Sequence, residues 1–179
     1  MEALQLSPQN SYLHVYTGNG KGKTTAAFGL ALRAAGAGKK VYFAQFVKGK
    51  TYSEIKAVEQ WLPMVTVKQY GRGCFIVKEP EQADIDAARD GLAEIKNILH
   101  SGQYQLVVLD EANIAIYYKL FSVSELLEVI AARHPDTEVV VTGRYAPQEL
   151  IDAADLVTEM KEIKHYYKEG VEARKGIEF

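Results

Sequence analysis

Short apolar runs alternate with segments of helical periodicity along this chain. The apolar runs are bounded by Gly, Lys or Pro and have the length of buried strands, whereas the other segments place apolar residues three or four positions apart, as amphipathic helices do. Strands that alternate with helices indicate an α/β fold with a parallel or mostly parallel sheet flanked by helices. The predicted strands cover residues 12–17, 41–47, 65–69, 106–109, 138–142 and 156–160, and the predicted helices cover about 23–35, 53–61, 81–99, 123–130 and 147–153.

The whole chain is expected to form a single domain. Its 179 residues suffice for one hydrophobic core, and no repeat or low-complexity segment marks a linker. Residues 1–11 carry no periodic pattern and are expected to form an irregular lead-in. Residues 161–179 are charged and aromatic without a clear period, and we expect this tail to pack near the functional site.

Composition argues against several classes of protein. The formal net charge of −2 gives no basic surface for nucleic acid, and no apolar run approaches the roughly 20 residues of a membrane span. The chain begins without the charged-then-apolar pattern of a secretion signal, so a cytoplasmic location is expected. Cys74 is the only cysteine, which excludes an internal disulfide and a zinc site rich in cysteine.

A glycine-rich segment connects the first predicted strand to the first predicted helix. It reads Thr-Gly-Asn-Gly-Lys-Gly-Lys-Thr-Thr over residues 17–25 and ends in the Gly-Lys-Thr of a P-loop, although Thr17 replaces the usual first glycine. In a P-loop, backbone N–H groups and the positive end of the helix form a site for phosphate. Lys23 is expected to reach phosphate oxygens, and the Thr24 hydroxyl to bind Mg²⁺. The alternative is a glycine-rich turn that binds nothing.

Polar residues follow the other predicted strands, and in a parallel sheet they meet the P-loop at one edge. Asp110 and Glu111 end an apolar strand, as the Mg²⁺-binding acids of P-loop proteins do, and either could be the closer ligand. Lys48 ends the second strand, and Arg144, after the fifth, could bind an anion or be a solvated turn residue. Arg33, on the first helix, could contact the nucleotide or lie at the surface.

These motifs together resemble the P-loop type of ATP:corrinoid adenosyltransferase, which acts on cob(I)alamin or cob(I)yrinic acid a,c-diamide. The resemblance spans about residues 13–179 and implies a P-loop NTPase-like, RecA-type fold. The order of the matching stretches is more specific than the P-loop alone. They are residues 17–29, 45–49, 109–111, 142–144 and 154–160, followed by Lys164-His165, Gly170-Val171 and Lys175-Gly176-Ile177-Glu178.

The resemblance implies an activity: transfer of the 5′-deoxyadenosyl group of ATP to the cobalt of a corrinoid, in adenosylcobalamin biosynthesis or salvage. Reduced Co(I) attacks C5′ of the ribose and tripolyphosphate leaves, so no side-chain nucleophile or general base is required. The loop, Lys23 and Mg²⁺ (or Mn²⁺) would stabilise the charge that grows on the leaving group. The family holds ATP in a reversed sense in the loop, with which Thr17 is consistent.

The resemblance also assigns roles to residues. It implies Lys23, Thr24 and Glu111 as catalytic groups, and Thr24, Asp110 and Glu111 as metal ligands. Aromatic residues after the third strand keep the lower face of cobalt apolar in the family; this chain has Cys-Phe-Ile at 74–76 where some members have Phe-Thr-Trp, so Phe75 is our candidate. Contacts with ATP or the corrinoid are expected at Gly18, Asn19, Gly20, Lys21, Gly22, Lys23, Thr24, Thr25, Arg33, Lys48, Phe75 and Arg144.

Partners follow from the same resemblance. A reduced flavoprotein is the expected reductant and a homodimer the expected assembly, with neither nucleic acid nor membrane as a partner. Two other functions stay open on the sequence. One is a P-loop NTPase or kinase with a different acceptor, and the other is a non-catalytic module that binds ATP and a corrinoid without turnover.

Overall fold

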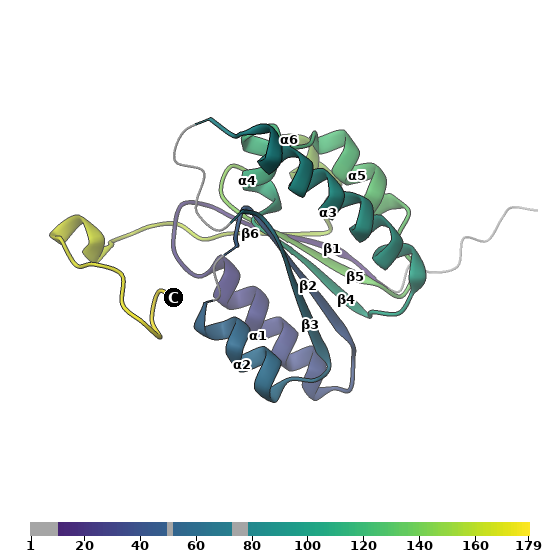
Figure 1. Ribbon diagram of the computed structural model, residues 1–179, viewed down its shortest axis with the longest axis horizontal. Helices are drawn as coiled ribbons and strands as arrows, with labels where there is room; N and C mark the ends of the chain where they lie inside the picture. Colours follow the sequence, from purple (N-terminus) through teal and green to yellow (C-terminus); the bar gives the residue numbers. More distant parts are fainter. Residues whose placement is uncertain (1–10, 50–51, 73–78) are drawn as a thin grey trace, which may run out of the picture.

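The computed structural model describes residues 11–49, 52–72 and 79–179, and its centre is a six-stranded sheet in which every strand pair is parallel (Figure 1). The strand order is β3-β2-β4-β5-β1-β6. The predicted α/β fold class with a parallel sheet is thereby confirmed. The strands are β1 Leu13–Thr17, β2 Val41–Phe46, β3 Val65–Tyr70, β4 Leu106–Asp110, β5 Glu138–Thr142 and β6 Leu156–Glu159.

Helices cover both faces of this sheet. Figure 1 shows α1 and α2 on one face and α3, α4, α5 and α6 on the other, with the tail extending past the P-loop at the start of α1. Such two-sided cover is the usual way to bury a parallel sheet. The helices are α1 Lys23–Gly36, α2 Ser53–Trp61, α3 Gln82–Ser101, α4 Ala112–Tyr117, α5 Val123–Ala131 and α6 Gln148–Ala153, and the tail contains the 3₁₀ helix η1 Tyr166–Glu169.

The two faces of the sheet are packed by different side chains. On the α1 face, the buried side chains of Ala27 and Ala31 are small, so the helix lies close to the sheet. Phe28 of α1 stacks on Phe43 of β2 with ring centroids 3.9 Å apart. Large residues fill the opposite face, among them Phe46, Leu92, Ile95, Leu99 and Leu126. Burial on both faces explains why β2 and β4 are almost continuously apolar.

Most predicted elements agree with the structure to within two residues at each end, but α4 was not predicted. This helix has only six residues and begins directly after Glu111, whose backbone φ is 59°. Six residues make fewer than two helical turns, which is too short for a helical period to show in the sequence. The edge strand β6 also differs from the apolar inner strands, because all four of its residues are exposed.

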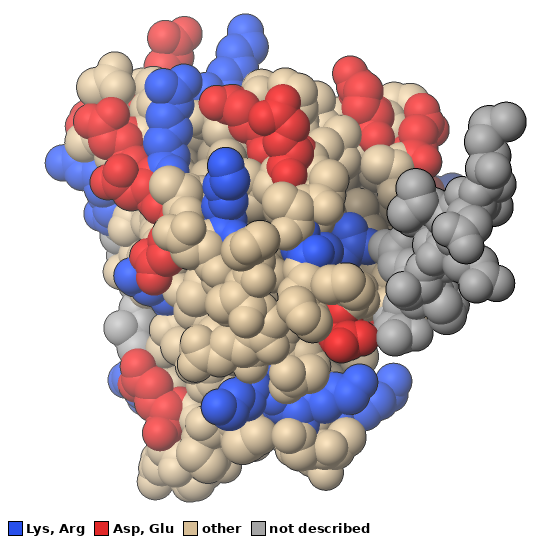
Figure 2. Space-filling model, turned by 90° about the vertical axis from the view of Figure 1, so that its right-hand side faces the viewer, with Lys and Arg blue, Asp and Glu red and all other residues tan. Residues whose placement is uncertain are grey.

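The surface carries charges of both signs. Figure 2 shows the side of the molecule at the right of Figure 1, where acidic and basic side chains are interspersed. This mixture agrees with the formal net charge of −2. Among the residues described, no helix has both the length and the apolar character that crossing a membrane requires.

Candidate functional site

The carboxyl ends of four strands and the P-loop meet at one edge of the sheet. β1 leads into the P-loop, and β2, β4 and β5 end beside it. In register, Gln45 of β2 lies beside Asp110 of β4, and Leu109 lies beside Val141 of β5. The fold therefore brings together the edge residues that the sequence placed at separate strand ends.

The P-loop is braced by the segment that follows β6. The Gly20 N–H donates to the Met160 carbonyl oxygen at 2.6 Å, and the Met160 N–H donates to the Thr17 oxygen at 2.8 Å. A Cβ atom at Gly20 would lie 2.7 Å from that Met160 oxygen, and one at Gly18 would lie 2.5 Å from it. Glycine is required at these two positions because another backbone approaches so closely.

Lys23 is folded into its own loop. Its Nζ donates to the carbonyl oxygens of Gly18 at 2.8 Å and Gly20 at 2.7 Å, and the residue is buried. Burial lowers the pKa of Lys23, as do the nearby Arg144 and Lys48, while Glu111 and Asp110 oppose that shift. These two carbonyls occupy two of the three N–H donors of the ammonium.

Asp110 is the centre of the polar cluster at this edge. Its Oδ1 accepts hydrogen bonds from the hydroxyls of Thr24 at 2.8 Å and Thr142 at 2.7 Å. Its Oδ2 accepts from Lys48 Nζ at 2.8 Å and from Gln45 Nε2 at 3.1 Å. The side chain is fully buried, so both oxygens depend on these four donors.

Glu111 has a different environment from its neighbour. Its backbone N–H donates to the Thr142 hydroxyl oxygen at 3.1 Å, while no hydrogen bond within the described ranges involves its carboxylate. Burial and the Asp110 charge raise the pKa of Glu111, and Lys48, Lys23 and Arg144 act in the opposite sense. Glu111 thus offers the freer oxygen atoms of the acidic pair.

Lys48 is positioned by a tight junction between the ends of β2 and β3. The preceding residue, Val47, has a φ of 58°, which turns the chain sharply after β2. A Cβ at Gly71 would lie 2.7 Å from the Lys48 nitrogen and 2.8 Å from its carbonyl oxygen, so the two segments touch through backbone atoms. Burial alone would lower the pKa of Lys48, but Asp110 and Glu111 raise it above its ordinary value.

Two glutamines belong to the site although the sequence did not assign them a role. Gln45 is fully buried and joins Asp110 to Gln69, whose Nε2 donates to Gln45 Oε1 at 3.0 Å. The available signal was the presence of one amide in the otherwise apolar run 41–47. Buried amides are costly without partners, so such a residue indicates a polar contact at that strand end.

The remaining predicted residues lie at varying distances from this cluster. Arg144 is exposed, but its charge acts on both Lys23 and Glu111. Arg33 is exposed in the last turn of α1, ten residues after Lys23, which corresponds to about 15 Å along the helix. Asn19 and Thr25 of the loop are also exposed. Phe75, the candidate for the apolar face of the corrinoid, lies outside the described residues.

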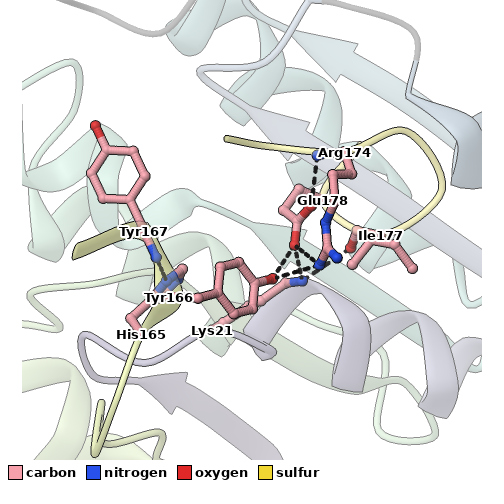
Figure 3. A network of polar contacts seen from close by, with 7 residues as sticks. All are labelled: Lys21, His165, Tyr166, Tyr167, Arg174, Ile177 and Glu178. Carbon is pink, nitrogen blue, oxygen red and sulfur yellow. Dashed lines mark hydrogen bonds and ion pairs between the residues drawn. The ribbon is translucent and has the colours of Figure 1, made fainter. Parts of the chain in front are cut away.

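The tail reaches back to the P-loop, as Figure 3 shows. Lys21 Nζ donates to the Ile177 carbonyl oxygen at 3.0 Å and to Glu178 Oε1 at 3.1 Å. Glu178 also accepts hydrogen bonds from the Tyr166 hydroxyl and from the Arg174 N–H. These donors, the Tyr166 hydroxyl first, hold the pKa of Glu178 below its ordinary range. The C-terminal residues are thereby joined to the P-loop.

Comparison with known proteins gives consistent matches over almost the whole chain. A family model described as "ATP:corrinoid adenosyltransferase BtuR/CobO/CobP" matches residues 9–179. The corrinoid adenosyltransferase of Pseudomonas aeruginosa is 39% identical over 176 residues, which cover 98% of this chain and 87% of the relative. That of Sinorhizobium is 36% identical over 168 residues (92% and 78%), and that of Escherichia coli K12 is 33% identical over 176 residues (98% and 89%).

Proposed function

This chain belongs to the ATP:corrinoid adenosyltransferase family, and we propose that it transfers the 5′-deoxyadenosyl group of ATP to the Co(I) centre of a corrinoid. Membership makes the chain a transferase with ATP and a corrinoid as the implied substrates. The proposal adds the chemistry of the step, which is attack of cobalt at C5′ with tripolyphosphate as the leaving group. It places this reaction in the biosynthesis or salvage of adenosylated corrinoids.

The observation that best supports this reaction is the gathering of positive charge at the end of the P-loop. Lys23, Lys48 and Arg144 all lie close enough to Glu111 for their charges to act on its carboxyl group. A departing tripolyphosphate carries several negative charges, and fixed cations stabilise such a group most in a water-poor site. The loop N–H groups and the start of α1 add partial positive charge at the same place.

The acidic end of the site fits a divalent cation such as Mg²⁺ or Mn²⁺. These ions take oxygen ligands, and the Glu111 carboxylate is free of hydrogen bonds within the described ranges. We propose the Thr24 hydroxyl and Glu111 as the residues that would hold it, with Asp110 positioning Thr24 through their 2.8 Å hydrogen bond. When bound, the cation would neutralise charge on the triphosphate oxygens.

The chemical step that we propose needs no acid or base from the protein. The electron pair of Co(I) forms the new Co–C5′ bond, and the C5′–O bond breaks with its electron pair leaving on the tripolyphosphate. The work of the chain is therefore to bind ATP, orient C5′ toward cobalt and stabilise the departing charge. In this scheme Lys23 turns from the Gly18 and Gly20 carbonyls onto the phosphates, and Lys48 and Arg144 share the charge.

The corrinoid side of the site is proposed from the resemblance alone. We expect Phe75 to face the lower side of cobalt, and a reduced flavoprotein to supply the electron that forms Co(I). Homodimer formation and a cytoplasmic location also stay predictions.

Mixing the protein with MgATP and a chemically reduced corrinoid under anaerobic conditions tests the proposal. We expect a light-sensitive Co–carbon product by absorption spectroscopy and one tripolyphosphate per product by ion chromatography. Release of orthophosphate with an unchanged corrin spectrum would instead indicate an NTPase or kinase. Binding of MgATP with neither product would indicate a non-catalytic binding module.

A further inference from the structure

Lys48 is the cation that the structure pairs with the buried acid of the site. Its Nζ lies 2.8 Å from Asp110 Oδ2 and 3.3 Å from Thr24 Oγ1, and its side chain is 10% exposed. The P-loop lysine does not compete for this position, because Lys23 donates to carbonyls of its own loop. One ammonium therefore touches both groups that P-loop proteins use around their divalent cation.

The backbone under Lys48 is fixed, while its side chain is long enough to choose another partner. Gly71, the residue that follows β3, packs against the Lys48 backbone nitrogen and oxygen and so holds its Cα position. A lysine side chain is a flexible stem of four carbons that ends in a compact ammonium group with three hydrogen-bond donors. It can therefore exchange one anionic partner for another. Arginine, with its planar fork, would be less suited to such an exchange.

A cation beside Asp110 compensates the charge that its three neutral donors leave unbalanced. Asp110 is fully buried, and an uncompensated buried carboxylate is strongly destabilising. The Lys48 ammonium, whose Nζ lies 2.8 Å from Asp110 Oδ2, supplies such a charge. A divalent cation bound at Thr24 and Glu111 would also place positive charge beside Asp110. Because two neighbouring cations repel each other, this metal and the Lys48 ammonium would compete for the position.

We propose that the Lys48 ammonium is a built-in counter-ion that disfavours binding of a divalent cation alone and turns onto the triphosphate when the metal–nucleotide complex arrives. Lys48 is then a positioning residue that makes metal binding depend on nucleotide. This inference rests on the proposed function, because it assumes that the metal–ATP complex binds at this loop. It goes beyond that function because it predicts that one substitution at Lys48 strengthens binding of the divalent cation alone and weakens binding of the metal–nucleotide complex.

Binding of Mn²⁺ alone and of Mn²⁺–ATP tests this role. Lys48→Met should bind Mn²⁺ alone at least about tenfold more tightly than the parent protein, measured from the paramagnetic resonance signal of free Mn²⁺. The same variant should bind Mn²⁺–ATP at least about tenfold more weakly, measured by calorimetry, because the triphosphate loses a charge partner. Lys48→Arg keeps the charge and should keep weak binding of Mn²⁺ alone.

Two further variants make the result decisive. Lys39→Met removes an exposed lysine that precedes β2, at the end of the strand away from Lys48, and it should change neither affinity. Lys48→Gln retains a donor for Asp110, and it replaces Lys48→Met if thermal melting shows that the latter is unfolded. Unchanged Mn²⁺ affinity, or affinities for both ligands that fall together, would overturn the inference.

The adenosylation assay keeps the two proposals apart. If the parent protein forms the Co–carbon product but the Lys48 variants lack the opposite changes, only the counter-ion role fails. If the opposite changes appear without any Co–carbon product, the counter-ion role stands and the proposed reaction fails.

Discussion

Lys23 shows how one residue of the site depends on its immediate surroundings. The sequence motif predicted a lysine that points to phosphate, whereas the structure has its ammonium bonded to the Gly18 and Gly20 carbonyls. Both partners lie in the same loop, so these hydrogen bonds are local to it. A phosphate group would offer the ammonium a negative charge in place of two neutral carbonyl dipoles, which favours the outward position.

Replacing Lys23 should remove most of the activity. We expect Lys23→Ala to lower the rate of Co–carbon bond formation from chemically prepared Co(I) by about 10²–10³-fold, because one preorganised charge on the leaving group is lost. The measurement is the initial rate followed by the corrin spectrum at saturating MgATP. Lys39→Ala, an exposed lysine far from the loop, serves as the control, and a near-parental rate in Lys23→Ala would contradict the assignment.

Gln45 and Lys48 show the limit of prediction at this scale. The sequence located both at the end of the second strand, and it could not tell which acid they would meet. They meet Asp110 because β2 pairs with β4 in a register that sets Gln45 beside Asp110. A shift of one residue would have turned Gln45 to the opposite face of the sheet.

At the scale of the elements, a second group of polar contacts joins β2, β3 and α3. The hydroxyls of Tyr42 and Tyr70 lie 2.8 Å apart, and Glu94 of α3 accepts from the Tyr42 hydroxyl at 3.3 Å. Burial, followed by the effect of Glu94, raises the pKa of Tyr42 to about 12. Burial and the Tyr42 hydroxyl likewise raise the pKa of Tyr70 above its ordinary value.

These tyrosines predict a loss of stability in alkaline solution. An unfolded tyrosine ionises near pH 10, whereas folded Tyr42 keeps its proton up to about pH 12, so the folded state binds more protons in that window. The free energy of unfolding should therefore fall as pH rises from 10 to 12, by at most about 1 kcal/mol per pH unit for this group. Urea unfolding at a series of pH values measures the slope.

Removal of the ionising group isolates its contribution. Tyr42→Phe should give a shallower fall in the free energy of unfolding than the parent protein, since it deletes one proton that only the folded state retains. Tyr12→Phe is the matched control, because Tyr12 is 52% exposed and takes no part in the contact of Tyr42 with Tyr70 and Glu94. Equal slopes in the parent and Tyr42→Phe would show that Tyr42 does not hold its proton.

At the scale of the whole molecule, the tail links the last strand to the P-loop and to α2. After β6 it passes the P-loop, where Glu178 and Ile177 meet Lys21, and its end reaches α2, where Ser53 Oγ donates to the Phe179 oxygen at 3.1 Å. The 3₁₀ helix η1 within it buries none of its residues. The tail is thus held by polar contacts and contributes little apolar burial to the fold.

Loss of the Glu178 charge should loosen this tail. Ion pairs near the protein surface contribute little free energy each, so Glu178→Gln should raise the rate of tryptic cleavage within residues 161–175 by only about two- to fivefold. Mass spectrometry of the released fragments gives the rate. Glu172→Gln removes a charge from the same tail with no contact to Lys21 and should cleave like the parent, and equal rates for both variants would contradict the proposed attachment.

Local sequence determined the succession of strands and helices along the chain, apart from the short helix α4, and also the P-loop and the acids at the end of β4. These features depend on the hydrophobic period, the length of each segment and the motif within a few neighbouring residues. Each can be recognised without knowing which other segments pack against it. Only the tertiary structure decided that Lys48 pairs with Asp110, that Gln45 joins Asp110 to Gln69, and that Glu178 meets Lys21 across 157 positions of sequence. Such contacts follow from strand order and register, which bring side chains together independently of their distance along the chain.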